Sequence, residues 1–338
     1  MASTPIRAQR YHWLVSSAFQ STVKTSLQPT SLTPATKALL GCSPLGSLLF
    51  TATYLIEGAT RPGYDAWQQA IGLRSLLRRH PIVGYFVMTF AISWGGALLV
   101  VAPTLLAGQP ITQTEGLLMF PVMLLGPSIS DFMMTALIDG KAGLRELFSR
   151  MRRWRLDPRW YLVLLLPPVL ILAVLALMSR LVSPVFTPNL FPAGIAIGLV
   201  AGMLEEIGWT GFAFPRLAAR FTPLPGALLL GLLWGLWHAP VVDFLGAAYP
   251  HGAYWLPFYL AFIGLVAAMR VLISWLATNT QSVLLPQLLH ASSTGSLALL
   301  APALVSPAQE ALWYAVYALC LWAVVALVVT IYGKSLGR

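Results

Sequence analysis

The feature that most constrains this chain is a series of long, almost uncharged apolar stretches. A helix needs about 20 mostly apolar residues to cross the ~30 Å hydrocarbon core of a bilayer. Only helices and closed barrels satisfy the backbone in lipid, and runs of this length exclude a barrel. The sequence therefore predicts an all-α polytopic membrane protein with eight transmembrane helices. The eight stretches are residues 82–106, 116–138, 160–182, 191–214, 224–245, 254–275, 282–300 and 311–332.

The charged residues predict the same architecture and exclude a soluble class. Charged types make up 9% of the chain and apolar types 57%, whereas a soluble domain carries roughly 25% charge. Lys and Arg cluster before the first stretch, between the second and third, after the fourth and after the eighth. The loops around residues 109, 184, 246 and 306 contain neither. This alternation places both termini in the cytoplasm and indicates no nucleic-acid partner, despite a net charge of +10.

Residues 1–73 differ from the rest of the chain. They are rich in Ser and Thr, and their first acidic residue is Glu57. Such a composition is typical of a transit peptide, and it also fits a disordered arm or a start site placed too far upstream. We predict an extension over 1–73 and a membrane domain over 74–338. The predicted location is a bacterial plasma membrane, or an organellar one if the extension is a transit peptide. Cys42 and Cys320 give no disulfide framework.

Few ionisable side chains lie inside the apolar stretches. Each costs at least about 2.5–3.5 kcal/mol at the centre of a membrane, so such groups are functional candidates. Glu205 and Glu206 lie in the fourth stretch, His238 in the fifth and His290 in the seventh. Arg270 lies near the end of the sixth, where its side chain is expected to snorkel to the interface.

The remaining polar groups are given a structural interpretation. Asp131 and Asp243 are expected to serve helix packing or the interface, and His251 to lie in an external loop. A single membrane histidine is often only a hydrogen-bond partner between helices, and a single glutamate can pair with an arginine. This interpretation stays open for the candidate site residues as well.

The spacing of the candidates suggests one cavity. Adjacent carboxylates point about 100° apart on a helix, so Glu205 and Glu206 are not expected to face the same small site. One of them is expected to have a raised pKa, which suits a general base. Trp234 and His238 are four residues apart and share a helix face. Three helices can then project Glu, His and His around a water molecule.

With these residues the sequence resembles the CAAX prenyl endopeptidase and bacteriocin-processing family of intramembrane proteases, also called Abi or CPBP proteins. The family pattern is Glu-Glu-x-x-x-Arg, then Phe-x-x-x-His, then His-x-x-x-Asn. The resemblance runs from about residue 73 to residue 327 and includes the basic loop 139–160. Thr210, Trp234 and Thr294 replace the Arg, Phe and Asn of the pattern. The matching positions are Glu205, Glu206 and Thr210, then Trp234 and His238, then His290 and Thr294.

The resemblance implies an endopeptidase for membrane-associated substrates, either prenylated CAAX-type proteins or bacteriocin-like precursors. It implies that Glu205 and His238 activate a water, with Glu206 beside them. It also implies that His290 stabilises the oxyanion with Thr294 as its partner. No cofactor is implied, and zinc held by the Glu-His-His set is the second choice. The implied partners are a peptide or lipidated-protein substrate and the lipid bilayer.

Two other functions stay open at this stage. The first is a non-catalytic membrane scaffold or immunity factor that keeps the protease fold, because Thr210 and Thr294 depart from the family pattern. The second is a proton-coupled transporter that uses the intramembrane acids and histidines as a relay.

Overall fold

The computed structural model describes residue 72 and residues 74–337. Every regular element in these residues is helical, which confirms the predicted all-α membrane class. The predicted extension lies almost entirely outside the described residues, as does Cys42. The α-helices are α4 (Pro81–Leu106), α5 (Gln113–Met123), α6 (Leu125–Ile138), α7 (Gly140–Met151), α8 (Arg159–Leu162), α9 (Leu166–Leu181), α10 (Ala193–Gly208), α11 (Phe214–Phe221), α12 (Pro223–Trp237), α13 (Trp255–Thr280), α14 (Leu284–Leu300) and α15 (Pro307–Tyr332). Short helical turns between or after them are η2 (Val163–Leu165), η3 (Trp209–Ala213), η4 (Ala239–Phe244), η5 (Gly252–Tyr254) and η6 (Gly333–Ser335).

Six helical segments of the described chain are long and apolar enough to cross a membrane. The other two predicted stretches form shorter helices, α12 with 15 residues and α14 with 17. At 1.5 Å per residue these helices are only about 22 to 26 Å long. The count of eight spans and the cytoplasmic termini therefore stay predictions. The six segments are Pro81–Leu106, Gln113–Ile138, Arg159–Leu181, Ala193–Phe221, Gly252–Thr280 and Pro307–Ser335.

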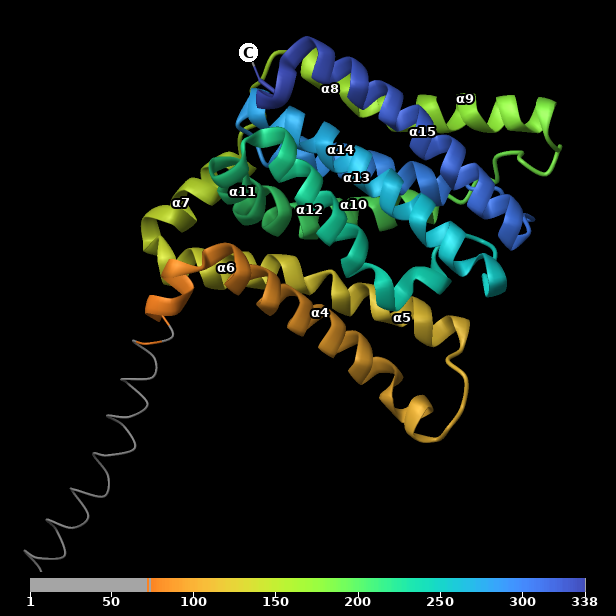
Figure 1. Cartoon of the computed structure of the whole chain (residues 1–338), viewed down its shortest axis with the longest axis horizontal. Coiled ribbons are helices and arrows are strands. Elements are labelled where there is room, and N and C mark those ends of the chain that lie inside the picture. The colour runs from red at the N-terminus through yellow and green to blue at the C-terminus, as the bar shows by residue number, and fades with distance from the viewer. Residues whose placement is uncertain (1–71, 73, 338) are drawn as a thin grey trace, which may run out of the picture. The chain divides into compact units, whose positions relative to one another are not determined.

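The two short helices lie in the middle of the membrane domain. Figure 1 shows α10, α12, α13 and α14 between two outer groups. One group is α4, α5 and α6, and the other is α9 and α15. Within the domain, α10 packs against α6 and α14, while α13 packs against α12 and α15. The inner helices are therefore covered by protein on two sides, which allows them to carry polar side chains.

Small residues let α10 approach α14 closely. A Cβ atom on Gly198 would lie 2.4 Å from the carbonyl oxygen of Ala291, and one on Gly202 would lie 2.4 Å from that of Gln287. Contacts this short leave room only for glycine. Residues four apart share a helix face, and Glu206 follows Gly202 by four. The same face that contacts α14 therefore carries Glu206 to it.

A single π-helical turn, η3, follows α10 directly. Such turns are rare and frequently occur at functional sites. Arg150 of α7 donates to the carbonyl oxygens of Thr210 at 3.3 Å and Gly211 at 3.4 Å. The basic segment after α6 thereby contacts the chain immediately beyond the two glutamates.

Candidate active site

The four ionisable residues predicted to form the site come together in the middle of the domain. Glu205 and Glu206 lie in the last turn of α10, His290 lies on α14, and His238 directly follows α12. All four side chains are buried. Trp234 of α12 contacts both imidazoles, with ring centroids 4.9 Å from His290 and 5.8 Å from His238.

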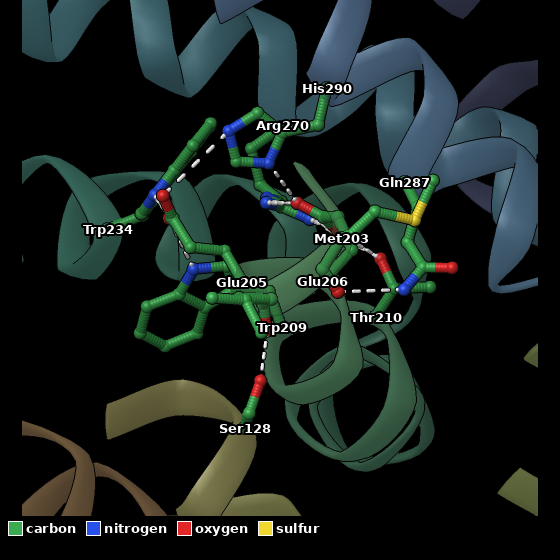
Figure 2. Close-up of polar contacts among 11 residues, drawn as sticks. Ser128, Met203, Glu205, Glu206, Trp209, Thr210, Trp234, Arg270, Gln287 and His290 are labelled. Atoms are coloured by element: carbon green, nitrogen blue, oxygen red, sulfur yellow. Dashed lines mark hydrogen bonds and ion pairs between the residues drawn. The ribbon is translucent and has the colours of Figure 1, made fainter. Parts of the chain in front are cut away.

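Two indole groups hold one oxygen of Glu205. The Nε1 atoms of Trp234 and Trp209 donate to Glu205 Oε2 at 2.7 and 3.0 Å. The other oxygen, Oε1, lies 4.0 Å from Nε2 of His290, and Figure 2 shows these two atoms facing each other. That distance is too long for a direct hydrogen bond. Two atoms 4.0 Å apart can share one water about 2.8 Å from each.

Glu206 has a full set of hydrogen-bond donors. Its Oε1 accepts from Arg270 Nη2 at 2.5 Å and from His290 Nδ1 at 2.9 Å. Its Oε2 accepts from Arg270 Nη1 at 2.9 Å and from Thr210 Oγ1 at 2.5 Å (Figure 2). Four donors, two of them on a cation, favour the ionised carboxylate. Glu206 therefore orients the side chains that donate to it, whereas Glu205 keeps one oxygen able to bind another partner.

Two expectations about these acids and their neighbours are wrong. Arg270 does not snorkel to the interface, because its side chain is fully buried in the ion pair with Glu206. The two glutamates also do not face separate sites. Both approach His290, because an imidazole presents nitrogens on two edges, and each carboxylate faces a different one.

The hydrogen bonds assign the protons of both histidines. His238 Nδ1 lies 2.8 Å from the carbonyl oxygen of Trp234, which can only accept. Nδ1 therefore carries hydrogen, and Nε2 of a neutral His238 is an acceptor. Nδ1 of His290 carries hydrogen as well, because it faces the carboxylate of Glu206. Each imidazole thus has its Nε2 atom left for a water or a substrate.

Two hydrogen bonds fix α10 to its neighbours just before the glutamates. Gln287 Nε2 of α14 donates to the carbonyl oxygen of Met203 at 2.8 Å, and the hydroxyl of Ser128 on α6 donates to that of Leu204. Figure 2 shows the Gln287 and Ser128 side chains reaching α10 from opposite sides. The backbone that carries the two acids is therefore held on both flanks.

Thr294 is the one predicted supporting residue without such a contact. It lies four residues after His290 on α14 and is half-buried. No hydrogen bond joins it to His290 in the described structure, where the Nδ1 partner is Glu206. Its role as a partner of the oxyanion group stays a prediction. Thr210, by contrast, contacts Glu206 directly.

Sequence reasoning missed two residues of the site, Arg270 and Trp209. A signal for Arg270 was present. It lies ten residues before the end of α13 at Thr280, a rise of about 15 Å. That depth is beyond the reach of a snorkelling side chain. Trp209 follows Glu205 by four residues, so the shared helix face was also readable.

An all-α membrane protein with a buried Glu–Glu–His–His centre on its inner helices is the class that this fold and site define. Residues 187–295 match the family described as type II CAAX prenyl endopeptidase Rce1-like. The matched segment contains all seven motif positions, from Glu205 to Thr294. A similar protein is the CAAX prenyl protease 2 of Methanococcus maripaludis, 31% identical over 112 residues. The aligned part is 31% of this chain, and the chain spans only 38% of that relative's length.

Proposed function

We propose that this protein is a membrane endopeptidase that uses Glu205 as general base on membrane-associated protein substrates. One observation carries the proposal. Glu205 has one oxygen held by two indoles and the other facing His290 Nε2 across 4.0 Å. This places a fixed, unshared carboxylate oxygen beside an imidazole nitrogen in a buried site, as water activation requires.

In the proposed reaction, Glu205 Oε1 takes a proton from the bound water as the water oxygen attacks the peptide carbonyl carbon. The carbonyl π bond breaks, and its oxygen becomes the oxyanion of a tetrahedral intermediate. The intermediate then collapses, the carbon–nitrogen bond breaks, and Glu205 returns the proton to the leaving nitrogen. The products are a carboxylic acid and an amine, which become a carboxylate and an ammonium ion once the acid proton passes to the amine, and Glu205 ends in its starting state.

The two histidines differ in what holds them. His290 is linked through Glu206 to a cation, and its Nε2 lies beside the proposed water. With both ring nitrogens protonated, Nε2–H donates to the oxyanion. His238 is tied only to a backbone carbonyl, and its ring lies against Trp237 and Phe262. Its Nε2 is the second acceptor for the attacking water. Thr294 is proposed as a lesser supporting group.

The proposed water activation uses protein groups alone. No group of three His, Cys, Asp or Glu side chains within the described part of the chain has an arrangement suited to a metal ion. Zinc bound by Glu205, His238 and His290 is the alternative. Metal analysis of the purified protein and the effect of a chelator on cleavage separate the two mechanisms.

The proposed substrates are prenylated proteins cut near their C-termini, because the matched family and the relative are both described as prenyl proteases. Bacteriocin-like precursors are the second substrate class. A lipid-anchored peptide already lies in the bilayer, so it reaches a site between membrane helices by lateral diffusion. The proposed location is a bacterial plasma membrane.

The test is cleavage of a fluorescent farnesylated C-terminal peptide by the full chain in proteoliposomes. Glu205→Gln removes the general base and is expected to lower kcat by about 10²–10⁴-fold. Glu146→Gln on the exposed face of α7 is the matched control and keeps the wild-type rate. The same peptide without its lipid is expected to be a much poorer substrate.

Two results would overturn the proposal. Equal cleavage by wild type and Glu205→Gln would remove the general base. No cleavage of either substrate class, with a cellular phenotype that Glu205→Gln still rescues, would favour the scaffold. Proton-linked solute flux into the same vesicles, lost in Glu205→Gln, would favour the transporter.

A further inference from the structure

Arg270 is a fully buried cation that the proposed mechanism does not use. Its guanidinium binds both oxygens of Glu206, and its Nη1 lies 3.5 Å from the hydroxyl of Thr210. Its central carbon lies 4.6 Å from the centre of the Trp234 ring. A buried guanidinium is costly unless it is well paired. Its contacts therefore identify the groups that depend on it.

Those contacts lead to both functional groups of the site. Through Glu206, Arg270 reaches Nδ1 of His290. Through the face of Trp234, it reaches the indole that donates to Glu205. Arg270 on α13 thus contacts Trp234 of α12, which donates to the proposed base. It also contacts Glu206 of α10, which accepts from His290.

The position of Arg270 is itself built into the packing of α12 on α13. A Cβ atom on Gly231 of α12 would lie 3.2 Å from Cβ of Arg270 and 2.8 Å from Cα of Ala267. Such close contact brings the two helix backbones together. The guanidinium then extends past α12 toward α10.

We propose that Arg270 is the positioning residue of the site. Its bidentate pair keeps Glu206 ionised, so that His290 holds its proton on Nδ1 and turns Nε2 toward Glu205. Its contact with Trp234 fixes the indole that orients Glu205. This inference rests on the proposed protease function, because its measured effect is on turnover.

The geometry also shows where the charge can be moved. Thr210 follows Glu206 by four residues on the same face and donates to its Oε2 at 2.5 Å. A guanidinium placed at position 210 in η3 therefore reaches the same carboxylate from the segment that follows α10. The site needs one cation beside Glu206, and it can accept that cation from η3 or from α13.

The experiment compares wild type, Arg270→Met, Thr210→Arg and the double variant Thr210→Arg/Arg270→Met in proteoliposomes with the farnesylated peptide. Arg270→Met is expected to lower kcat by about 10–100-fold, with KM little changed, as partners of a reacting group usually do. The double variant is expected to recover most of that loss. Thr210→Arg alone places two cations at one carboxylate and is expected to be less active than the double variant.

A purely structural role would not produce rescue by a moved charge. Wild-type kcat in Arg270→Met overturns the inference. So does a double variant that melts at the wild-type temperature but turns over no faster than Arg270→Met. If Arg270→Met does not fold, Arg270→Gln replaces it, since Gln keeps hydrogen-bond donors without the charge. A wild-type kcat in that variant also overturns the inference.

The same assays separate this inference from the proposed function. Loss of cleavage in Glu205→Gln shows that the protease reaction is being measured. With that result in hand, an unaffected Arg270→Met concerns Arg270 only. Cleavage that survives Glu205→Gln instead overturns the proposed function itself.

Discussion

Two buried histidines of this protein, His290 and His251, each lie between two carboxylates. The nitrogens of His290 lie 2.9 Å from Glu206 and 4.0 Å from Glu205. The charge of Glu206 is paired with Arg270, and one oxygen of Glu205 has no hydrogen-bond donor in the described structure. In this cluster the charge of Glu206 is balanced, and the open oxygen of Glu205 can accept a hydrogen bond from a new partner.

The cluster around His251 is arranged differently. The imidazole Nδ1 lies 3.1 Å from Asp243 Oδ1, which also accepts the backbone N–H of His251 at 2.7 Å. Nε2 lies 3.4 Å from Glu310 Oε2. Glu310 also accepts the backbone N–H groups of Ala247 at 2.9 Å and Ala248 at 2.6 Å. Both carboxylates therefore already accept backbone N–H bonds, while His251 Nε2 makes an ion-pair contact with Glu310 but no hydrogen bond within the described part of the chain.

The difference teaches how to read a buried imidazole between acids. In the His251 cluster the donors and acceptors are used to tie the loop after η4 to the first turn of α15. In the His290 cluster, Oε1 of Glu205 has no hydrogen-bond donor among the described residues and faces an imidazole nitrogen across 4.0 Å. A carboxylate oxygen left open in this way marks the proposed active site, whereas both acids around His251 are held by backbone N–H groups.

The largest expected effect tests this comparison directly. His290→Ala is expected to lower kcat/KM for the farnesylated peptide by about 10²–10³-fold, the usual loss for one oxyanion donor. His251→Ala is expected to leave kcat/KM close to wild type but to lower the free energy of unfolding by about 3 kcal/mol, because it leaves the buried Glu310 and the half-buried Asp243 without their cation. Cleavage rates and thermal transitions of the two variants are the measurements. Equal loss of activity in both variants would erase the distinction.

Much of the His290 cluster was predictable because membrane physics makes its members rare. Glu205, Glu206, His238 and His290 stand out as ionisable groups in apolar runs. Arg270 was misassigned because hydropathy gives a residue's place along a helix but not which face is covered by protein. Its partner lies on a helix 64 residues earlier in the chain, and no local pattern links the two.

The close packing of α10 on α14 also has a signal in the sequence. Gly194, Gly198 and Gly202 recur every four residues, the small-residue pattern of close helix contacts in membranes. Extending that spacing reaches Glu206 and predicts that it, more than Glu205, points at α14. The His251 cluster had no such signal, since its three members come from three separate elements.

The second prediction uses that glycine face to disturb one cluster without the other. A Cβ atom on Gly202 meets backbone atoms of α14 at 2.4 and 2.6 Å, so Gly202→Ala must push α10 and α14 apart. A misplacement of about 1 Å at a reacting group costs about 10²-fold in rate, and overpacking costs about 1–3 kcal/mol of stability. Gly264→Ala on α13 is the matched control, because its Cβ would meet only Ala318 at 3.8 Å.

The expected outcome is loss of cleavage in Gly202→Ala with the control unchanged. Both variants keep the His251 cluster, so the contribution of His251→Ala to the thermal transition is expected to be the same in either background. A wild-type kcat in Gly202→Ala would show that the close packing of α10 on α14 does not set the geometry of the site.

The smallest expected effect is a pH dependence of stability that belongs to His251 alone. Burial by itself lowers the pKa of His251, but the hydrogen bonds and charges of Glu310 and Asp243 outweigh it and raise the pKa above its usual value of 6.5. A histidine whose folded pKa is raised stabilises the folded state when protonated. That contribution is complete below the unfolded pKa of about 6.5 and is lost as the pH rises through the higher folded pKa.

The difference in thermal transition between wild type and His251→Ala is therefore expected to be largest near pH 6 and to shrink toward pH 9. This pH-dependent part of the difference is expected to be a few degrees at most for a domain this size. His80→Ala, at an exposed position, serves as the control. A difference that stays constant across this range would mean that His251 holds the loop as a neutral hydrogen-bonding group, and the contrast between the two clusters would then rest on geometry alone.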